Sequence, residues 1–139
     1  MRLAGLWAAC ALICCCCGCG GGNSSPTNVG TNQNPIVGRW AADTIQGPGG
    51  VAQSCPAAID VGVNTYACGL NDTQVFRADG SYDESSGAQR GTWTANGGSL
   101  TVTLNGQSPR TLSYSVLENV LTEQAPTGSG PITIKFHRQ

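Results

Sequence analysis

Cysteines are the residues of this chain whose type and position point most clearly to chemistry. Two of the eight, Cys55 and Cys68, lie far from the N-terminus. The others gather within the first nineteen positions, at Cys10, Cys14, Cys15, Cys16, Cys17 and Cys19. That cluster contains neither a histidine nor a spaced cysteine pair of the kind that holds zinc. Modification of one thiol and oxidation of a thiol pair are therefore the chemistries to consider.

Side chains that could perform catalysis are few and poorly arranged. The one histidine, His137, falls on the strand face opposite Phe136, where we expect it to be solvated. Asp83 and Glu84 are adjacent, and neighbours in a strand point to opposite faces, so they do not form a working carboxylate pair. No metal-ligand spacing, calcium loop or glycine-rich phosphate cradle occurs. We expect no catalytic residue, no metal and no cofactor, and thus not an enzyme.

The first nineteen residues have the composition of an export signal. Arg2 supplies one positive charge, an apolar run follows from Leu3, and small residues end the run. The run is shorter than the roughly 20 apolar residues that a transmembrane helix needs, so a permanent span is the weaker interpretation. Residues 1–18 are therefore predicted to be a signal peptide.

The segment Gly18-Cys19-Gly20 resembles the cleavage site of bacterial lipoproteins. In that family the mature N-terminal cysteine carries a thioether-linked diacylglycerol and an amide-linked acyl chain, of which palmitate is the expected one. More than one chain gives stable membrane anchoring. The resemblance implies that Cys19 is lipidated and that the protein lies in the cell envelope, at the outer membrane in a Gram-negative cell because Gly20 follows the cysteine. Cys16 stands where such sites usually carry leucine, so another cysteine of the cluster and an ordinary secreted protein remain alternatives.

The composition after Cys19 predicts a flexible tether and then one domain. Residues 19–34 are rich in Gly, Ser, Thr, Asn and Pro and bury too little apolar surface to fold. Residues 35–139 have the length of a single domain with a modest core. Charged residues make up 11% of the chain and the net charge is -1. No basic field exists to attract nucleic acid, which we exclude as a partner.

Turn signals recur about every ten residues after Pro35 and predict an antiparallel all-β domain. The apolar faces keep a consistent parity through successive hairpins, from Phe76 opposite Tyr82 to Leu121 opposite Phe136. A two-residue turn at 87–88 would set Tyr82 opposite Trp93. A sheet with one apolar face must close to bury that face, so we predict a small eight-stranded antiparallel up-and-down barrel. Its expected strands are residues 38–45, 73–77, 81–86, 89–95, 99–104, 110–116, 120–125 and 131–137.

The domain resembles the lipocalin-like domains of bacterial lipoproteins. The residues that carry this resemblance are Gly38-Arg39-Trp40, the run from Phe76 to Tyr82, Gly91-Thr92-Trp93-Thr94, the run from Leu100 to Leu104, and Lys135-Phe136-His137-Arg138. In lipocalins the tryptophan of Gly-x-Trp plugs the closed end of the barrel and an arginine of the last strand stacks on it. The resemblance implies these roles for Trp40 and Arg138; the alternative is that Trp40 is one more core aromatic.

Cys55 and Cys68 are the cysteines left after the anchor, and an exported protein meets an oxidising compartment, so we predict a disulfide between them. They lie in the one long connection, residues 46–72, which is too long for an idle hairpin loop and is either functional or locally folded. The lipocalin resemblance implies a lid over the open end of the barrel. A stapled surface loop with no ligand role is the alternative.

Two functions of different classes follow. One is a carrier of a small apolar ligand, with small residues such as Gly91 and Ala125 leaving space among the inward aromatics. The expected ligand-binding residues are Phe76, Tyr82, Trp93, Tyr114 and Glu123. Inward polar groups, Glu123 with Glu84 and Arg110, either contact the ligand or are simply hydrated at the barrel mouth. The alternative function is a protein-binding or protease-inhibitor-like module presented at the envelope, and a solidly filled interior would favour it.

Overall fold

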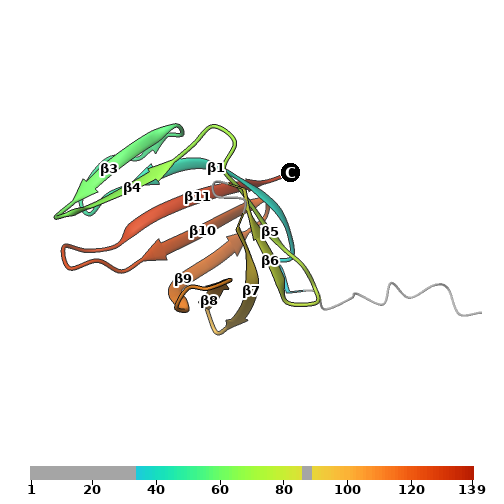
Figure 1. The fold of residues 1–139 in the computed structure, drawn as a ribbon. Helices are drawn as coiled ribbons and strands as arrows, with labels where there is room; N and C mark the ends of the chain where they lie inside the picture. The colour runs from blue at the N-terminus through green and yellow to red at the C-terminus, as the bar shows by residue number, and fades with distance from the viewer. Residues whose placement is uncertain (1–33, 86–88) are drawn as a thin grey trace, which may run out of the picture. The chain divides into compact units, whose positions relative to one another are not determined.

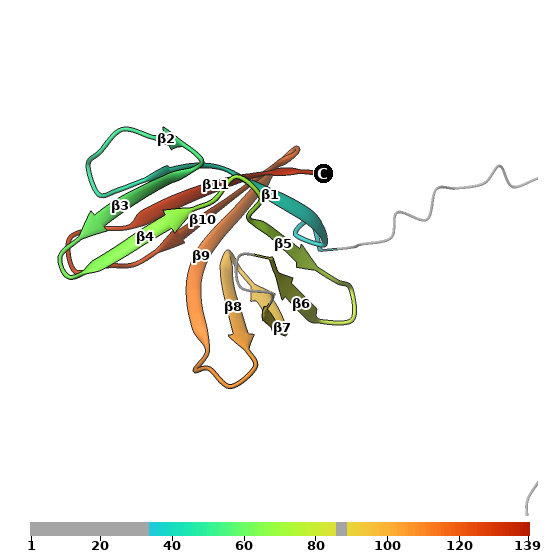
Figure 2. The same ribbon diagram turned by 45° about the horizontal axis from the view of Figure 1, so that its top comes forward.

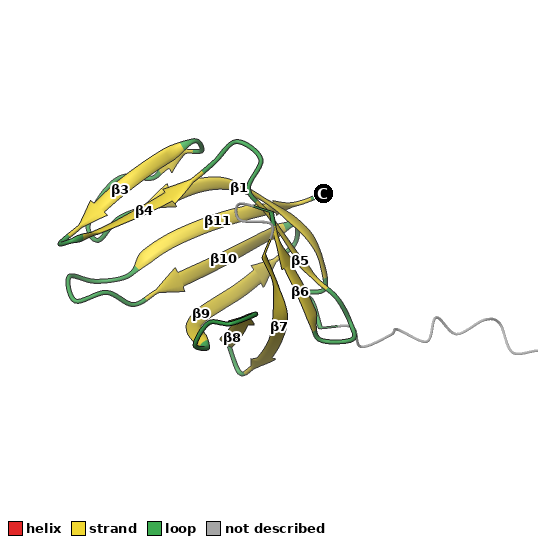
Figure 3. Cartoon of the chain, viewed as in Figure 1, coloured by secondary structure: helices red, strands yellow, loops and turns green. Residues whose placement is uncertain are grey.

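The structure is a computed structural model that describes residues 34–85 and 89–139, and these ranges contain strands and turns but no helix (Figures 1 and 3). The predicted signal peptide, the lipidation site Cys19 and the tether up to residue 33 lie outside the described residues. Within the described ranges there is no helix that could span a membrane. The strands are β1 (Gly38–Gln46), β2 (Gln53–Ser54), β3 (Ala57–Val61), β4 (Asn64–Cys68), β5 (Thr73–Phe76), β6 (Ser81–Glu84), β7 (Gln89–Asn96), β8 (Ser99–Leu104), β9 (Arg110–Leu117), β10 (Val120–Ala125) and β11 (Ile132–Arg138).

Eight of these strands form a closed antiparallel up-and-down barrel, as predicted (Figure 2). Strands β5 to β11 follow one another in the sheet in chain order, β1 pairs with β5, and β1 also pairs with β11. The closing pair places Trp40 opposite Arg138 and Ala42 opposite Phe136. Closure pairs the two edges of the sheet and buries its apolar face.

Most of the expected hairpin registers are confirmed. Phe76 lies opposite Tyr82, and Leu121 lies opposite Phe136. One register was wrong by two residues, because Tyr82 lies opposite Gly91 rather than Trp93. Glu84 and Gln89 are the last paired residues there, so the β6–β7 connection is longer than a two-residue turn. A shift of two keeps the parity, and the inward face of the barrel is therefore unchanged.

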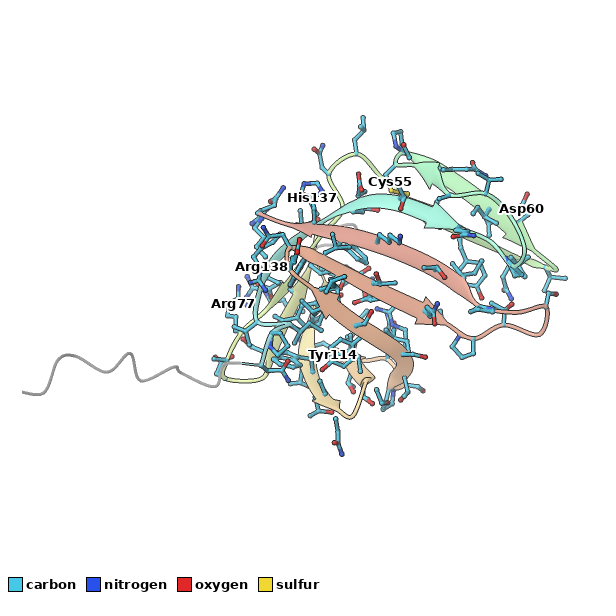
Figure 4. All side chains as sticks on the ribbon, turned by 180° about the vertical axis from the view of Figure 1, so that it is seen from behind. Cys55, Asp60, Arg77, Tyr114, His137 and Arg138 are labelled. Atoms are coloured by element: carbon cyan, nitrogen blue, oxygen red, sulfur yellow. A yellow bond between two sulfur atoms is a disulfide. The ribbon has the colours of Figure 1, made fainter. Side chains whose placement is uncertain are left out.

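The long connection between β1 and β5 is locally folded. It contains β2, which pairs with β1, and a separate two-stranded sheet of β3 and β4, which packs against β1. We call the β3–β4 hairpin with its disulfide the stapled hairpin. Its Cys55–Cys68 bond is present with an S–S distance of 2.07 Å, which confirms the predicted pairing (Figure 4). Closing a loop of this size contributes about 3 kcal/mol in the chain-entropy model.

The apolar core has two parts. The larger part fills the barrel on the side where β1 begins and β11 ends, and its members are Ile36, Trp40, Phe76, Tyr82, Trp93, Leu100, Val102, Leu104, Leu121 and Phe136. The smaller part lies beneath the stapled hairpin, where Ile45, Cys68 and Ile132 are buried together. The hairpin is thus attached to the barrel by packing as well as by the chain.

Candidate functional site

The end of the barrel where β1 begins and β11 ends brings together the pair that the sequence singled out. Trp40 is fully buried, and its indole Nε1 donates a hydrogen bond to the Ile36 carbonyl at 2.7 Å. The guanidinium carbon of Arg138 lies 4.3 Å from the centroid of the Trp40 ring. The same guanidinium donates to the carbonyls of Val37 at 2.9 Å and Pro35 at 2.6 Å. Arg138 therefore holds the segment before β1 against the tryptophan.

Three of the expected ligand-binding aromatics contact one another and form a packed floor inside the barrel. Phe76 and Tyr82 have ring centroids 5.0 Å apart, and Phe76 and Trp93 meet edge to face at 5.5 Å. The Trp93 indole also donates to the Arg77 carbonyl at 2.9 Å. Tyr114 is half-buried and packs against the same cluster. These rings pack in the same buried cluster as Trp40 and fill this part of the interior.

Four side chains form what we call the polar layer: Gln74, which lies directly opposite Trp40 in the β1–β5 pairing, Glu84, Arg110 and Glu123. Gln74 Nε2 donates to Glu123 Oε2 at 3.3 Å, although β5 and β10 are separated in the sheet by β1 and β11. Arg110 Nη2 donates to Glu84 Oε2 at 3.2 Å, although β6 and β9 are separated by β7 and β8. The Gln74–Glu123 contact therefore crosses the interior of the barrel, whereas the Arg110–Glu84 pair is open to solvent, with the arginine side chain 51% exposed.

The polar layer contains two buried acceptor atoms without a hydrogen-bond partner in the described residues, Oε1 of Gln74 and Oε1 of Glu123. Glu123 is only 7% exposed. Burial raises the pKa of its carboxyl to about 7, Glu84 adds to the rise, and Gln74 and Arg110 oppose it. Burial also raises the pKa of Tyr82, with Glu84 and Glu123 as further causes. The layer is short of hydrogen-bond donors.

We expect Glu123 to make the protein less stable as the pH rises from about 4.5 to 7. The folded state holds the Glu123 proton that the unfolded chain releases near 4.5, so the free energy of unfolding falls by about 3 kcal/mol across this window and is flat above it. Asp79 and Asp83 have lowered pKa values and act with the opposite sign, but below about pH 4.

Urea unfolding of the wild type and the Glu123→Gln variant between pH 4.5 and 8 measures this effect. The variant should lack the slope and be more stable than the wild type at pH 8 by about 3 kcal/mol, because its neutral amide avoids burying a charge. Parallel stability curves for the two proteins would show that Glu123 titrates as an ordinary surface carboxyl.

A cavity of about 100 Å³ lies next to the polar layer. Its walls include Gln74, Glu84, Ile134 and Phe136 of the barrel, together with Ala67 and Cys68 of the stapled hairpin. The hairpin therefore forms part of the wall of this cavity. The lid over the open end of the barrel, which the lipocalin resemblance implied, stays a prediction. Gln74, which was not singled out from the sequence, shares strand parity with Phe76 and could have been found by that signal.

A larger depression of about 650 Å³ lies elsewhere, between the β7–β8 turn and the β10–β11 connection. It is open to solvent, and residues such as Gly97, Thr111, Gln124 and Pro126 line it without any charged group. This depression is not enclosed, and its described lining residues contain no buried polar atom that lacks a hydrogen-bond partner. The smaller cavity beside the polar layer is therefore the better candidate site.

Gly91 does not create the interior space that the sequence suggested. A Cβ at this position would lie 2.0 Å from the Thr103 carbonyl oxygen and 2.9 Å from Leu104 Cα. The missing side chain therefore allows β7 and β8 to approach each other closely, and the backbone of β8 takes up the space. Ala125 is half-buried opposite Ile132 and does not line the cavity.

The remaining candidates for chemistry lie apart from one another. Asp83 faces outward and pairs with Arg77, whereas Glu84 faces the interior, which confirms that they are not a pair. His137 is exposed on the outer face of β11 (Figure 4). Within residues 34–85 and 89–139, no group of three His, Cys, Asp or Glu side chains is placed to hold a metal ion.

The fold and the site define a closed antiparallel barrel with an aromatic floor, a polar layer and a small covered cavity. Comparison with known protein families, curated proteins and solved structures gives no match for this chain.

Proposed function

We propose that the protein is a lipid-anchored lipoprotein of the cell envelope whose lipocalin-like barrel binds a small ligand in the cavity beside the polar layer. The observation that carries this proposal is the pair of unpartnered buried acceptors, on Gln74 and Glu123, beside a covered cavity. A buried acceptor without a partner costs about 1–3 kcal/mol, and native proteins keep such groups chiefly where a bound molecule or function requires them.

The size of the cavity narrows the ligand that the sequence suggested. Pockets for drug-sized molecules usually measure about 300–1,000 Å³, whereas this one holds about 100 Å³. The aromatic side chains of Phe76, Tyr82 and Trp93 fill the part of the interior where an extended apolar ligand would lie. We therefore propose a ligand of a few non-hydrogen atoms, or the small end of a longer molecule.

The membrane part of the proposal is supported by the apolar run that ends in Gly18-Cys19-Gly20. Expressed in a Gram-negative host, the wild type should incorporate radioactive palmitate and partition into detergent. A Cys19→Ser variant should incorporate none and stay in the aqueous phase, because the diacylglycerol is attached to that thiol. Incorporation of palmitate into the Cys19→Ser protein would mean that another cysteine is lipidated. No incorporation into either protein would contradict the lipoprotein assignment.

The ligand part of the proposal is tested by closing the cavity. We expect some small alcohol, amide, carboxylate or amine of two to six non-hydrogen atoms to give a saturable calorimetric titration with the full-length protein in detergent. Ala67→Leu should abolish that binding, because Ala67 is an exposed residue that lines the cavity and a leucine there should obstruct its opening. Ala58 lies opposite Ala67 in the same hairpin but outside the cavity wall, so Ala58→Leu is the matched control and should bind normally.

No saturable binding of any such compound to a folded protein would contradict the ligand proposal. Engagement of another protein through the stapled hairpin would then be the better account. One observation favours that second candidate: Val63 at the hairpin turn is fully exposed, and Val51 and Leu70 in the same connection are 83% and 75% exposed.

A further inference from the structure

The chemistry of the ligand can be inferred from what the polar layer lacks. Gln74 Oε1 belongs to a residue of the cavity wall, and Glu123 Oε1 belongs to a side chain that faces the interior and is 7% exposed. Both atoms are acceptors, and the Gln74 amide nitrogen already donates to the other Glu123 oxygen. A molecule that completes this layer must therefore donate hydrogen bonds.

The charges around the cavity restrict the net charge that a hydrogen-bond-donating ligand can carry. Asp72 and Glu84 are both in the cavity wall, and Glu123 lies one hydrogen bond behind Gln74. Arg110 is the cation that the described structure pairs with this group, and its bond goes to Glu84. Three carboxylates against one guanidinium leave an excess of negative charge, so an anionic ligand would be repelled and a cation attracted.

We propose that the cavity binds a small organic ammonium ion, whose N–H groups donate to Gln74 Oε1 and whose charge is balanced by Glu123 and Glu84. This inference rests on the proposed function, since it names the ligand class of the same site. The cavity wall also contains Ile134 and Phe136, which suit the carbon atoms of such an ion. A volume of about 100 Å³ accommodates an ion of the size of ethylammonium but not a large apolar ligand.

Binding of an ammonium ion should depend on the ionisation of Glu123. The titratable and charged groups that face Glu123 are Tyr82, Glu84, Arg110 and Tyr114, which lies directly opposite it on β9; the Gln74 amide also contacts it. The raised pKa of Tyr82 keeps its hydroxyl protonated in the neutral range, whereas the pKa of Glu123 is about 7. About nine-tenths of Glu123 is therefore ionised at pH 8 and about one-tenth at pH 6, so the apparent affinity should be about tenfold higher at pH 8.

The test is a calorimetric titration of the full-length protein in detergent with ethylammonium chloride, and in parallel with 1-propanol and sodium propionate as neutral and anionic probes. We expect saturable binding of ethylammonium alone, about tenfold weaker at pH 6 than at pH 8. Glu123→Gln should weaken it at least tenfold at pH 8. Asp83→Asn removes a carboxylate from the outer face of β6 and should leave the affinity for ethylammonium unchanged. Urea unfolding confirms that each variant is folded.

The outcomes separate this inference from the proposed function. Equal binding of 1-propanol or propionate, or unchanged binding of ethylammonium to the Glu123→Gln variant, would overturn the ammonium assignment while a small-ligand site remained. If no probe binds to the wild type or to the Ala67→Leu variant, the cavity holds water only. That result would overturn both the ammonium assignment and the small-ligand site.

Discussion

Replacement of Trp40 by alanine is expected to lower the free energy of unfolding by about 3–5 kcal/mol. Trp40 is fully buried in the larger part of the core, so the variant loses a large apolar side chain there and leaves a cavity. It also leaves the Ile36 carbonyl without the indole donor at 2.7 Å. Urea unfolding of the full-length protein at pH 6 measures the change.

The Arg138→Ala variant distinguishes a closing device from an ordinary core aromatic. If the pair closes the barrel, Arg138→Ala should cost about 2 kcal/mol, because the carbonyls of Val37 and Pro35 lose a charged donor and the ring loses its stacked cation. A loss below about 0.5 kcal/mol for Arg138→Ala, with a full loss for Trp40→Ala, would assign Trp40 to the core alone.

Gly91→Ala should destabilise the barrel by about 4 kcal/mol or more, despite adding only one methyl group. The new Cβ would overlap the Thr103 carbonyl oxygen at 2.0 Å, and backbone atoms of β8 cannot move aside as the end of a flexible side chain can. Strands β7 and β8 must separate, which disrupts the pairing of Gly91 with Leu104. Since the barrel is closed, such a separation disturbs the whole ring of strands.

Gly128→Ala is the matched control for this substitution. No atom lies within 4 Å of a Cβ built at Gly128, so its stability should stay within about 0.5 kcal/mol of the wild type. Circular dichroism with urea unfolding compares the two variants. A Gly91→Ala protein as stable as the Gly128→Ala protein would contradict the close approach of β7 and β8.

Local parity explains why the barrel could be predicted from the sequence. Each hairpin fixes which residues share a face, so Phe76 with Tyr82 and Leu121 with Phe136 followed from turn positions alone. The same argument placed Glu123 on the inward face. The disulfide followed because Cys55 and Cys68 were the cysteines left after the N-terminal cluster.

Features that depend on closure could not be predicted in the same way. Gln74 and Glu123 are 49 residues apart in the chain. Their contact exists only because the sheet closes with a particular stagger. Strands β3 and β4 could not be predicted individually, because the apolar residues of this connection pack on Ile45 and Ile132, which are distant in the chain. Gly91 was misread because parity reports the face of a residue but not the distance to the neighbouring backbone.

A high-resolution crystal structure of the full-length protein, grown at pH 8 with ethylammonium chloride, tests the central claim most directly. On this account, the cavity beside the polar layer is a binding site for a small ligand that donates hydrogen bonds. The predicted result is continuous density for the ion in that cavity, with its nitrogen within about 3 Å of Gln74 Oε1. Density for separate water molecules in the same place, at an ethylammonium concentration that saturates any measured binding, would contradict the claim.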